Sequence, residues 1–286
     1  MGRFAVMSIV EHLNEITTAL DELKVPYLVM GGHAVRYYGF NRETTDHDLH
    51  IPENVGKNLS DLLRQTSLFV SVPLTESITW RGEADFKRYV IGILPDGKEE
   101  LLEFWIHSHL LDDFTDLYQR REEGFYGEKT VSFLSLPDLI RSKETEREND
   151  WQDISFLEEV LDQRNLTNTK NDKEIISALA NLRSVRGLET AMNKGFTANQ
   201  ANVETALRET KSPIAQAFLI PFAPHLEAEL PANEVLPSPF RKHLKLAEPS
   251  SSRHLALVEA VRLRYKRAMQ DLDRLDKDEH RKKQQK

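Results

Sequence analysis

Two aspartates stand one residue apart in the segment "TTDHDLHIP", among residues that otherwise favour a buried strand. Successive side chains on a strand point to opposite faces. Asp46, Asp48 and His50 would therefore share one face, while His47, Leu49 and Ile51 would share the other, which would face the core. Carboxylates placed at i and i+2 repel each other, and at low dielectric one of their pKa values rises. A divalent cation removes this repulsion, and magnesium prefers one or two protein carboxylates together with water and phosphate oxygens. The pattern therefore predicts a metal site, with a solvated turn as the alternative.

A pair of glycines precedes the aspartates. Gly31 and Gly32 end the apolar run "PYLVM", and "HAVRYYGF" follows with helical character. Free backbone N–H groups at the start of a helix bind anions, and glycine lets a phosphate approach the backbone closely. The order of strand, glycine pair and short helix therefore predicts a phosphate site, and a plain turn is the other interpretation.

Two further charged residues interrupt apolar patterns. Glu103 is the isolated charge in "LLEFWI" and would supply a third carboxylate for a two-metal site, unless it is an exposed edge-strand acid. Glu100 is less suitable, because we expect it at the solvent-exposed start of the same strand. Lys143 continues the buried helical stripe of "LPDLIRSK", so it needs a partner. That partner is either a nucleoside triphosphate or a carboxylate, from Asp150 or Asp153.

Other polar residues lie beside these positions. Arg42, Thr44 and Thr45 directly precede the aspartates, where substrate contact and loop solvation are equally good interpretations. His50 shares the face of the aspartates, but a hydrogen-bonded structural histidine is the commoner case. Arg88 is taken as an ordinary strand residue, with a place in an acceptor groove as the alternative.

Helices and strands that would position these residues are indicated by periodicity and turn signals. Apolar residues at spacings of three and four predict helices, and short apolar runs bounded by glycine or proline predict strands. Ser135 is a natural N-cap three residues before Asp138. The predicted helices cover residues 6–25, 33–40, 55–66 and, as one or two helices, 133–163. The predicted strands cover 26–32, 44–52, 85–94 and 98–108.

The composition changes near residue 165, so we expect two domains, residues 1–165 and 166–286. Beyond that point strand signals are scarce and helical ones common. Residues 211–250 are rich in proline and predict short helices and turns. From Arg253 onward a long basic helix is expected. Its apolar stripe would pack against this protein's own helices or a second copy in a homodimer, and contact with RNA is the alternative.

The overall composition limits the function. The chain has 286 residues and a formal net charge of -8, which argues against a general nucleic-acid coat. It has no cysteine, which excludes disulfides, thiolate zinc sites and cysteine catalysis. No apolar run approaches the roughly 20 residues of a membrane span, and the first residues do not have the pattern of a signal peptide. We therefore expect a cytoplasmic protein with no membrane partner.

The segments Met30-Gly31-Gly32, Asp46-His47-Asp48-Leu49 and Leu102-Glu103-Phe104 together resemble the nucleotidyltransferase superfamily, which has the polymerase-β-like fold. The stretch "GGHAV…R-x-T-T-D-H-D-L" looks most like the bacterial stand-alone group, which includes toxin-type transferases from toxin–antitoxin loci. Its members often carry helices like those at 136–154 here. The resemblance covers residues 1 to about 160. It implies an α+β fold: a small mixed-sheet nucleotidyltransferase core flanked by helices, here followed by a mostly helical C-terminal region.

The resemblance also implies an activity, the transfer of a nucleoside monophosphate from an NTP to an acceptor with release of pyrophosphate. Asp46, Asp48 and Glu103 would hold Mg²⁺ or Mn²⁺ and perform catalysis. The nucleotide would be bound by Gly31, Gly32, Arg42, Thr45 and Lys143. The implied acceptor is a tRNA, a protein or a small-molecule hydroxyl, and a toxin would have a cognate antitoxin as partner.

The chain departs from the superfamily pattern at two positions. His47 stands where an aliphatic residue is usual, and Glu103 stands where many members have Asp. These departures keep a second hypothesis open, a catalytically silent nucleotidyltransferase-like module that binds a partner.

Overall fold

The computed structural model describes residues 8–66, 76–80, 84–94, 96–108, 110–144 and 148–229. The chain divides into two compact units, residues 1–144 and 145–286. The domain boundary expected from the sequence comes later, at residue 165. That residue lies near the C-terminal end of the long helix Glu148–Thr167. The two units are described separately below.

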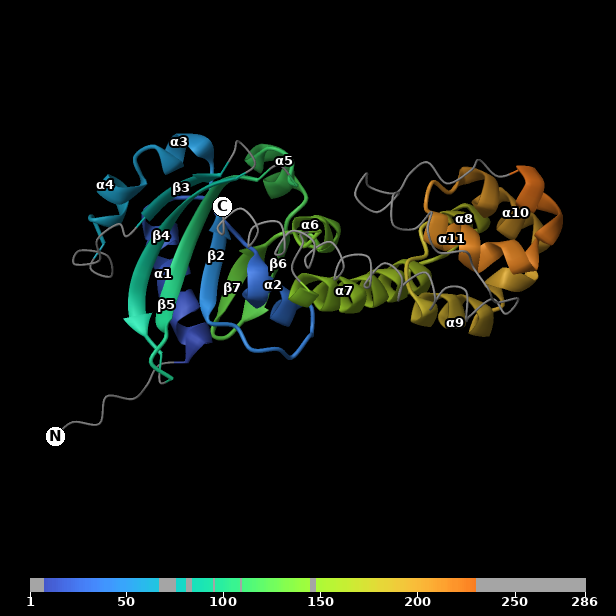
Figure 1. The fold of residues 1–286 in the computed structure, drawn as a ribbon, viewed down its shortest axis with the longest axis horizontal. Coiled ribbons are helices and arrows are strands. Elements are labelled where there is room, and N and C mark those ends of the chain that lie inside the picture. Colours follow the sequence, from blue (N-terminus) through green and yellow to red (C-terminus); the bar gives the residue numbers. More distant parts are fainter. Residues whose placement is uncertain are drawn as a thin grey trace, which may run out of the picture. The chain divides into compact units, whose positions relative to one another are not determined.

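Unit 1 is built on a mixed sheet of seven strands in the order β3-β4-β5-β2-β1-β7-β6 (Figure 1). Strand β2 runs parallel to β5, and β1 runs parallel to β7, while the other neighbours are antiparallel. The strands are β1 (Leu28–Val29), β2 (Asp46–His50), β3 (Glu76–Trp80), β4 (Ala84–Ile93), β5 (Glu99–Ser108), β6 (Glu122–Tyr126) and β7 (Lys129–Phe133). The expected mixed sheet is confirmed, and it is larger than the sequence indicated.

Six helices in the described part of unit 1 flank this sheet. They are α1 (Ile9–Glu22), α2 (Gly31–Tyr37), α3 (Glu53–Gly56), α4 (Leu59–Leu63), α5 (Phe114–Gln119) and α6 (Leu136–Ser142). Helix α1 crosses one face of the sheet, behind β4 and β5 in Figure 1. Its apolar stripe, Leu13, Ile16 and Leu20, is buried as its spacing predicts.

Helix starts follow the predicted capping chemistry. Ser8 caps α1 in a capping box with Glu11. Ser135 caps α6, where its side chain accepts a hydrogen bond from the backbone N–H of Asp138. Such caps satisfy backbone donors that the first helical turn leaves unpaired, and each typically contributes about 1 kcal/mol.

Two expectations differ from the structure in unit 1. The hairpin of β6 and β7 was not predicted, yet β7 lies beside β1 in the sheet. Glu100 was expected at the solvent-exposed start of its strand, but its exposed fraction is only 3%. It is buried because two histidines from other segments hydrogen-bond to it, as described below.

The described part of unit 2 is helical, as predicted. It contains α7 (Glu148–Thr167), α8 (Asp172–Ala180), α9 (Val185–Asn193), α10 (Gln200–Glu209) and α11 (Pro213–Leu219), with 3-10 turns η1 (Phe196–Ala198), η2 (Ile220–Phe222) and η3 (Pro224–Glu229). They bury a core of their own that includes Leu166, Leu179, Leu188, Leu207 and Phe218. The basic helix expected from Arg253, and most of the expected proline-rich turns, lie outside the described residues.

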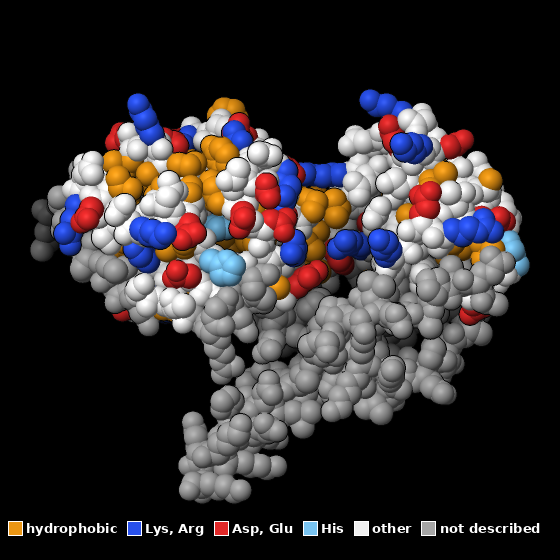
Figure 2. Space-filling view, turned by 90° about the horizontal axis from the view of Figure 1, so that it is seen from above, with side chains coloured by type: hydrophobic (Ala, Val, Ile, Leu, Met, Phe, Trp, Pro, Cys, Tyr) orange, Lys and Arg blue, Asp and Glu red, His pale blue; other side chains and the backbone are white. Residues whose placement is uncertain are grey.

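Two surface properties bear on function. None of the described helices combines the length and the apolar character that crossing a membrane requires. Figure 2 shows basic and acidic side chains interspersed on the described surface of unit 1 in that view. This mixture agrees with the chain's acidic balance and differs from the single-sign field typical of a nucleic-acid coat.

Candidate functional site

The predicted carboxylates lie on neighbouring parallel strands. Asp48 in β2 is in register with Glu103 in β5, so their side chains leave the sheet on the same face. Asp46, two residues before Asp48, shares that face. Leu49 is fully buried on the opposite face, which agrees with the predicted alternation. The strand pairing thus gathers acids from two distant segments on one side of the sheet.

The negative charges of these acids influence one another. Burial, and next the charge of Glu103, raises the pKa of Asp48 to about 6. Asp46 contributes in the same direction, while the positive charge of Lys143 lowers the pKa. A hydrogen bond from the indole Nε1 of Trp105, at 3.4 Å from Asp48 Oδ1, also lowers it. A cation bound here would therefore stabilise the ionised form of Asp48 against its burial and its acidic neighbours.

Glu103 is engaged by a partner that the sequence did not reveal. Arg88 in β4 is in register with Glu103, and its Nε and Nη2 lie 2.8 Å and 2.7 Å from Glu103 Oε1. The carboxylate oxygens of Asp46, Asp48 and Glu103 do not all lie within 4.8 Å of one another. A cation shared by all three would therefore require the Glu103 side chain to turn from Arg88 toward Asp48.

The glycine pair lies directly against the acids. Gly31 has φ +61°, and a Cβ atom there would lie 1.8 Å from Asp48 Oδ2. A Cβ on Gly32 would lie 2.2 Å from Thr44 Oγ1 and 3.0 Å from Arg42 Nη2. Both positions exclude a side chain because the backbone passes so close to its neighbours. Helix α2 has only seven residues. We therefore assign the glycines a role through the close approach of other groups to their backbone, and not through a helix dipole.

The loop before β2 holds the polar residues predicted beside the site. Thr45 Oγ1 donates a hydrogen bond of 3.2 Å to Asp46 Oδ1, and Thr44 Oγ1 donates one of 3.3 Å to the backbone oxygen of Asp46. Thr45 therefore orients the first aspartate. Arg42 Nη2 lies near Gly32, where Thr44 Oγ1 also lies. The structure thus brings all three loop residues to the start of β2.

Lys143 follows the last turn of α6 and is buried, with an exposed fraction of 5%. Its effect on the pKa of Asp48 places its ammonium within electrostatic reach of that carboxylate. The helix is fixed at its other end, where Arg120 Nε and Nη2 lie 2.6 Å and 2.8 Å from the two carboxylate oxygens of Asp138. This bidentate ion pair holds the helix that presents Lys143.

These residues fit a divalent cation of the magnesium class. Their donors are carboxylate oxygens, which Mg²⁺ and Mn²⁺ prefer. Burial and the charges of Glu103 and Asp46 raise the pKa of Asp48, and a cation would oppose that effect. Because Gly31 has no Cβ, Asp48 Oδ2 can lie directly against the backbone at that residue. His50 is not part of this donor set, because its Nδ1 donates to the backbone oxygen of Trp105 at 2.8 Å and it is buried against Phe114.

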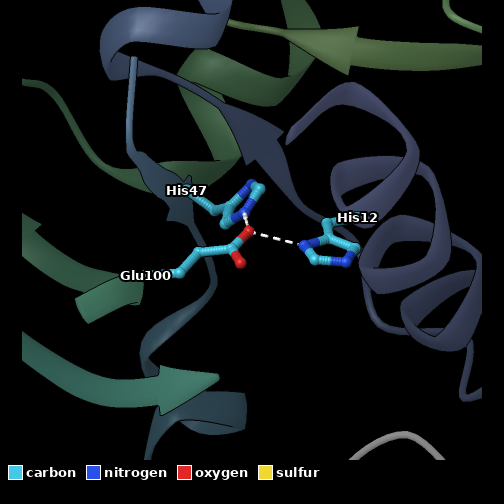
Figure 3. Close-up of side chains that lie close together, drawn as sticks. All are labelled: His12, His47 and Glu100. Carbon is cyan, nitrogen blue, oxygen red and sulfur yellow. Dashed lines mark hydrogen bonds and ion pairs between the residues drawn. The ribbon is translucent and has the colours of Figure 1, made fainter. Parts of the chain in front are cut away.

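A second polar cluster, not predicted from the sequence, lies on the opposite face of the same strands (Figure 3). His47 Nε2 and His12 Nδ1 lie 2.8 Å and 2.6 Å from Glu100 Oε1. His47 Nδ1 lies 3.1 Å from His33 Nε2, and His33 Nδ1 lies 2.9 Å from the hydroxyl of Tyr126. The alternation of β2, with His47 between two aspartates, was the one signal that placed a polar side chain on this face.

The protonation of this cluster follows from its contacts. Burial raises the pKa of Glu100, but hydrogen bonds from His47 and His12 outweigh it, so the net pKa is lowered and the carboxylate is ionised. Burial, with the charges of His47 and Arg36, lowers the pKa of His33 well below 6.5, so this imidazole is neutral. An ionised carboxylate only accepts hydrogen bonds, so both facing imidazoles donate to it.

Comparison with known proteins gives low-identity structural similarities. No family model matches the chain, and no curated protein matches its sequence. Among solved structures, a nucleotidyltransferase-like protein from Paracoccidioides brasiliensis is 19% identical, with 70% of this chain and 92% of that chain covered and a TM-score of 0.37.

Two antibiotic-modifying enzymes show similarities of the same order. The lincosamide antibiotic adenylyltransferase LnuA is 16% identical, with 52% of this chain and 96% of that chain covered and a TM-score of 0.38. The enzyme ANT(2")-Ia, solved with adenylyl-2"-tobramycin, is 17% identical, with 75% of this chain and 98% of that chain covered and a TM-score of 0.34. Because these identities and TM-scores are low, the activity is inferred below from the site's own geometry.

Proposed function

We propose that this chain is a metal-dependent nucleotidyltransferase that moves a nucleoside monophosphate from an NTP to an acceptor hydroxyl. One observation carries the proposal: Asp46, Asp48 and Glu103 share a sheet face beside a backbone turn that leaves no space for side chains. Lys143 adds a buried cation within electrostatic reach of Asp48. Carboxylates, a close-approach backbone and a cation are the groups that binding and transferring a phosphoryl-type group requires.

The carboxylates would hold Mg²⁺ or Mn²⁺, which when bound supplies charge compensation for the triphosphate and the leaving pyrophosphate. Asp46, oriented by Thr45, and Asp48 would hold the ion that accompanies the nucleotide. Glu103, released from Arg88, would face the acceptor and take up the proton of its hydroxyl at a carboxylate oxygen.

The remaining residues bind and orient the nucleotide. Gly31 and Gly32 have no side chains of their own, so phosphate oxygens would approach their backbone closely, beside Asp48 and Arg42. Lys143 and Arg42 neutralise the triphosphate. In the reaction, the acceptor oxygen forms a bond to the α-phosphorus, the bond from that phosphorus to the bridging oxygen breaks, and pyrophosphate leaves.

Three finer assignments rest on the sequence resemblance: a tRNA, protein or small-molecule acceptor, a role as the toxin of a toxin–antitoxin pair, and a cognate antitoxin as partner. A homodimer is proposed from the apolar stripe expected after Arg253, and a cytoplasmic location from the sequence composition. The mixed surface charge of unit 1 (Figure 2) selects none of these acceptors.

The test is transfer of label from each of four α-³²P-labelled NTPs, with Mg²⁺, to total RNA, total protein and hydroxyl-bearing small molecules. Asp48→Asn should abolish transfer, because it removes a carboxylate beside the glycine turn. Asp61→Asn is the matched control, since the Asp61 side chain is 83% exposed and lies elsewhere in unit 1. Transfer that survives in Asp48→Asn would refute the proposed site.

A catalytically silent, partner-binding module is the second candidate, and one contact favours it. Arg88 holds Glu103 Oε1 with two nitrogens, which withdraws this carboxylate from the aspartates. If wild-type protein transfers no label to any acceptor and releases no pyrophosphate, this candidate replaces the first.

A further inference from the structure

The cluster of His12, His47 and Glu100 lies outside the proposed catalytic site. In the described part of the chain, it is the group whose ligand atoms, one from each residue, all lie within 4.8 Å of one another. Figure 3 shows the two imidazoles facing one carboxylate oxygen from α1 and β2, while the carboxylate comes from β5. Three segments distant in the sequence therefore present two nitrogens and an oxygen to a single point.

The geometry points to a second metal site here, one that takes Zn²⁺ or a similar transition-metal ion through His12 Nδ1, His47 Nε2 and Glu100. Two imidazoles and one carboxylate form a donor set that zinc uses with a fourth position left to water. Imidazole nitrogen suits zinc, copper, nickel and iron, whereas magnesium and calcium prefer oxygen. The two faces of strand β2 would thus hold metals of different classes.

The distances are compatible with this role after a small movement. Zinc bonds of about 2.0–2.1 Å in a tetrahedron place neighbouring ligand atoms roughly 3.3 Å apart. The present separations from Glu100 Oε1 are 2.6 Å to His12 Nδ1 and 2.8 Å to His47 Nε2. An opening of about half an ångström or slightly more, of the kind side-chain rotation gives, makes space for the ion. The His12 side chain is 32% exposed, so it can move, and water can reach the fourth position.

The surroundings of His47 support metal binding. A metal-bound imidazole needs a partner for its other nitrogen, which fixes the ring and its tautomer. His47 Nδ1 has that partner in His33 Nε2, and His33 Nδ1 has one in the Tyr126 hydroxyl. With metal on His47 Nε2, the proton of His47 moves to Nδ1 and donates to His33, and the proton of His33 then donates to Tyr126. All ring nitrogens of His47 and His33 then have a partner, and both imidazoles are neutral.

Such an ion would join α1, β2 and β5 on the face opposite the aspartates. Because His47 lies between Asp46 and Asp48, the ion would fix the strand that carries the proposed catalytic carboxylates. The inference does not depend on the proposed transferase activity, since its ligands, its metal class and its readout are separate.

The experiment titrates chelator-treated full chain with Zn²⁺ alone by calorimetry, and with Co²⁺ followed by visible absorption. We expect one Zn²⁺ per chain on this site, the spectrum of four-coordinate Co²⁺, and a raised unfolding temperature. His12→Gln and Glu100→Gln should each weaken zinc binding at least tenfold. His12→Gln is the decisive variant, because partial exposure of His12 makes it the one that disturbs folding least.

Two variants control the result. His107→Gln removes an exposed histidine of the same strand, β5, and should leave the zinc affinity unchanged. Asp48→Asn alters the opposite face and should leave this zinc ion bound. The inference is overturned if wild type binds no zinc, if His12→Gln binds it as tightly as wild type, or if His107→Gln weakens binding equally. Loss of the single zinc ion in Asp48→Asn, with retention in His12→Gln, would overturn it too.

Discussion

Substitution of Gly31 by alanine gives the sharpest prediction about the proposed nucleotide site. Two effects combine at this position. The positive φ of +61° costs about 1–2 kcal/mol for a residue with a Cβ. The new Cβ would also lie 1.8 Å from Asp48 Oδ2, whereas non-bonded atoms require more than roughly 3 Å. The carboxylate must therefore move by over about 1 Å. Misplacing a metal ligand in this way should weaken binding of a Mn²⁺–nucleotide complex by roughly 10- to 100-fold.

Gly97 provides the matched control, because its φ is +85° and a Cβ there meets nothing within 4 Å. Gly97→Ala should lose a similar 1–2 kcal/mol of unfolding free energy while binding the nucleotide like wild type. The assays are urea unfolding followed by tryptophan fluorescence, and titration with a fluorescent non-hydrolysable ATP analogue in Mn²⁺. Equal nucleotide affinity in the two alanine variants would refute the proposal that the glycine protects the position of Asp48.

Three other perturbations test separate parts of the account. Arg88→Gln should tighten Mn²⁺ binding several-fold, because it releases the Glu103 carboxylate, and it should lower the unfolding free energy by about 1–2 kcal/mol. The Mn²⁺ affinity is measured by electron paramagnetic resonance, and an unchanged affinity would contradict this expectation. Asp138→Ala should destabilise the chain by about 1–3 kcal/mol, because it removes two hydrogen bonds from Arg120, which stays 40% exposed and paired with Asp112. It should also weaken nucleotide binding through Lys143, and full binding would show that the anchoring is irrelevant. Burial raises the pKa of the Asp162 carboxyl from 3.8 to about 6. The native state therefore keeps the carboxyl proton at pH values where the unfolded state has lost it. As a result, the free energy of unfolding falls as the pH rises from about 4 to about 6. Over that window wild type should lose up to about 3 kcal/mol relative to Asp162→Asn in urea unfolding, and parallel pH profiles would contradict the assignment.

Local sequence signals predicted part of the geometry around these residues. Strand alternation placed Asp46 and Asp48 on the face opposite Leu49, which the structure buries completely. The capping serine before α6 and the apolar stripe of α1 were also evident, because both depend on residues three or four apart. Signals of this kind involve near neighbours, so a single sequence contains them in full.

Features that depend on pairing between distant segments were not predictable. The partner of Glu103 is Arg88, fixed by the register of β4 and β5, and a one-residue shift would have put the arginine on the other face. Strand β7, "KTVSF", is short and partly polar, and its place beside β1 comes from long-range assembly.

Glu100 shows the same difficulty from another direction. An acid at the start of a strand is usually solvated, and only its contacts with His12 and His47 explain its burial. Those histidines come from segments 88 and 53 residues away in the chain. Sequence reasoning about one segment therefore placed this carboxylate in solvent.

The central claim is that Asp46, Asp48 and Glu103 hold a divalent ion beside the glycine turn when a nucleotide binds. Anomalous diffraction at the manganese edge, from crystals grown with Mn²⁺ and a non-hydrolysable NTP, tests it most directly. The account predicts a manganese peak coordinated by Asp46, Asp48 and triphosphate oxygens next to Gly31, with the Glu103 side chain turned away from Arg88. A nucleotide bound elsewhere, or bound here with no manganese in contact with Asp48, would contradict it.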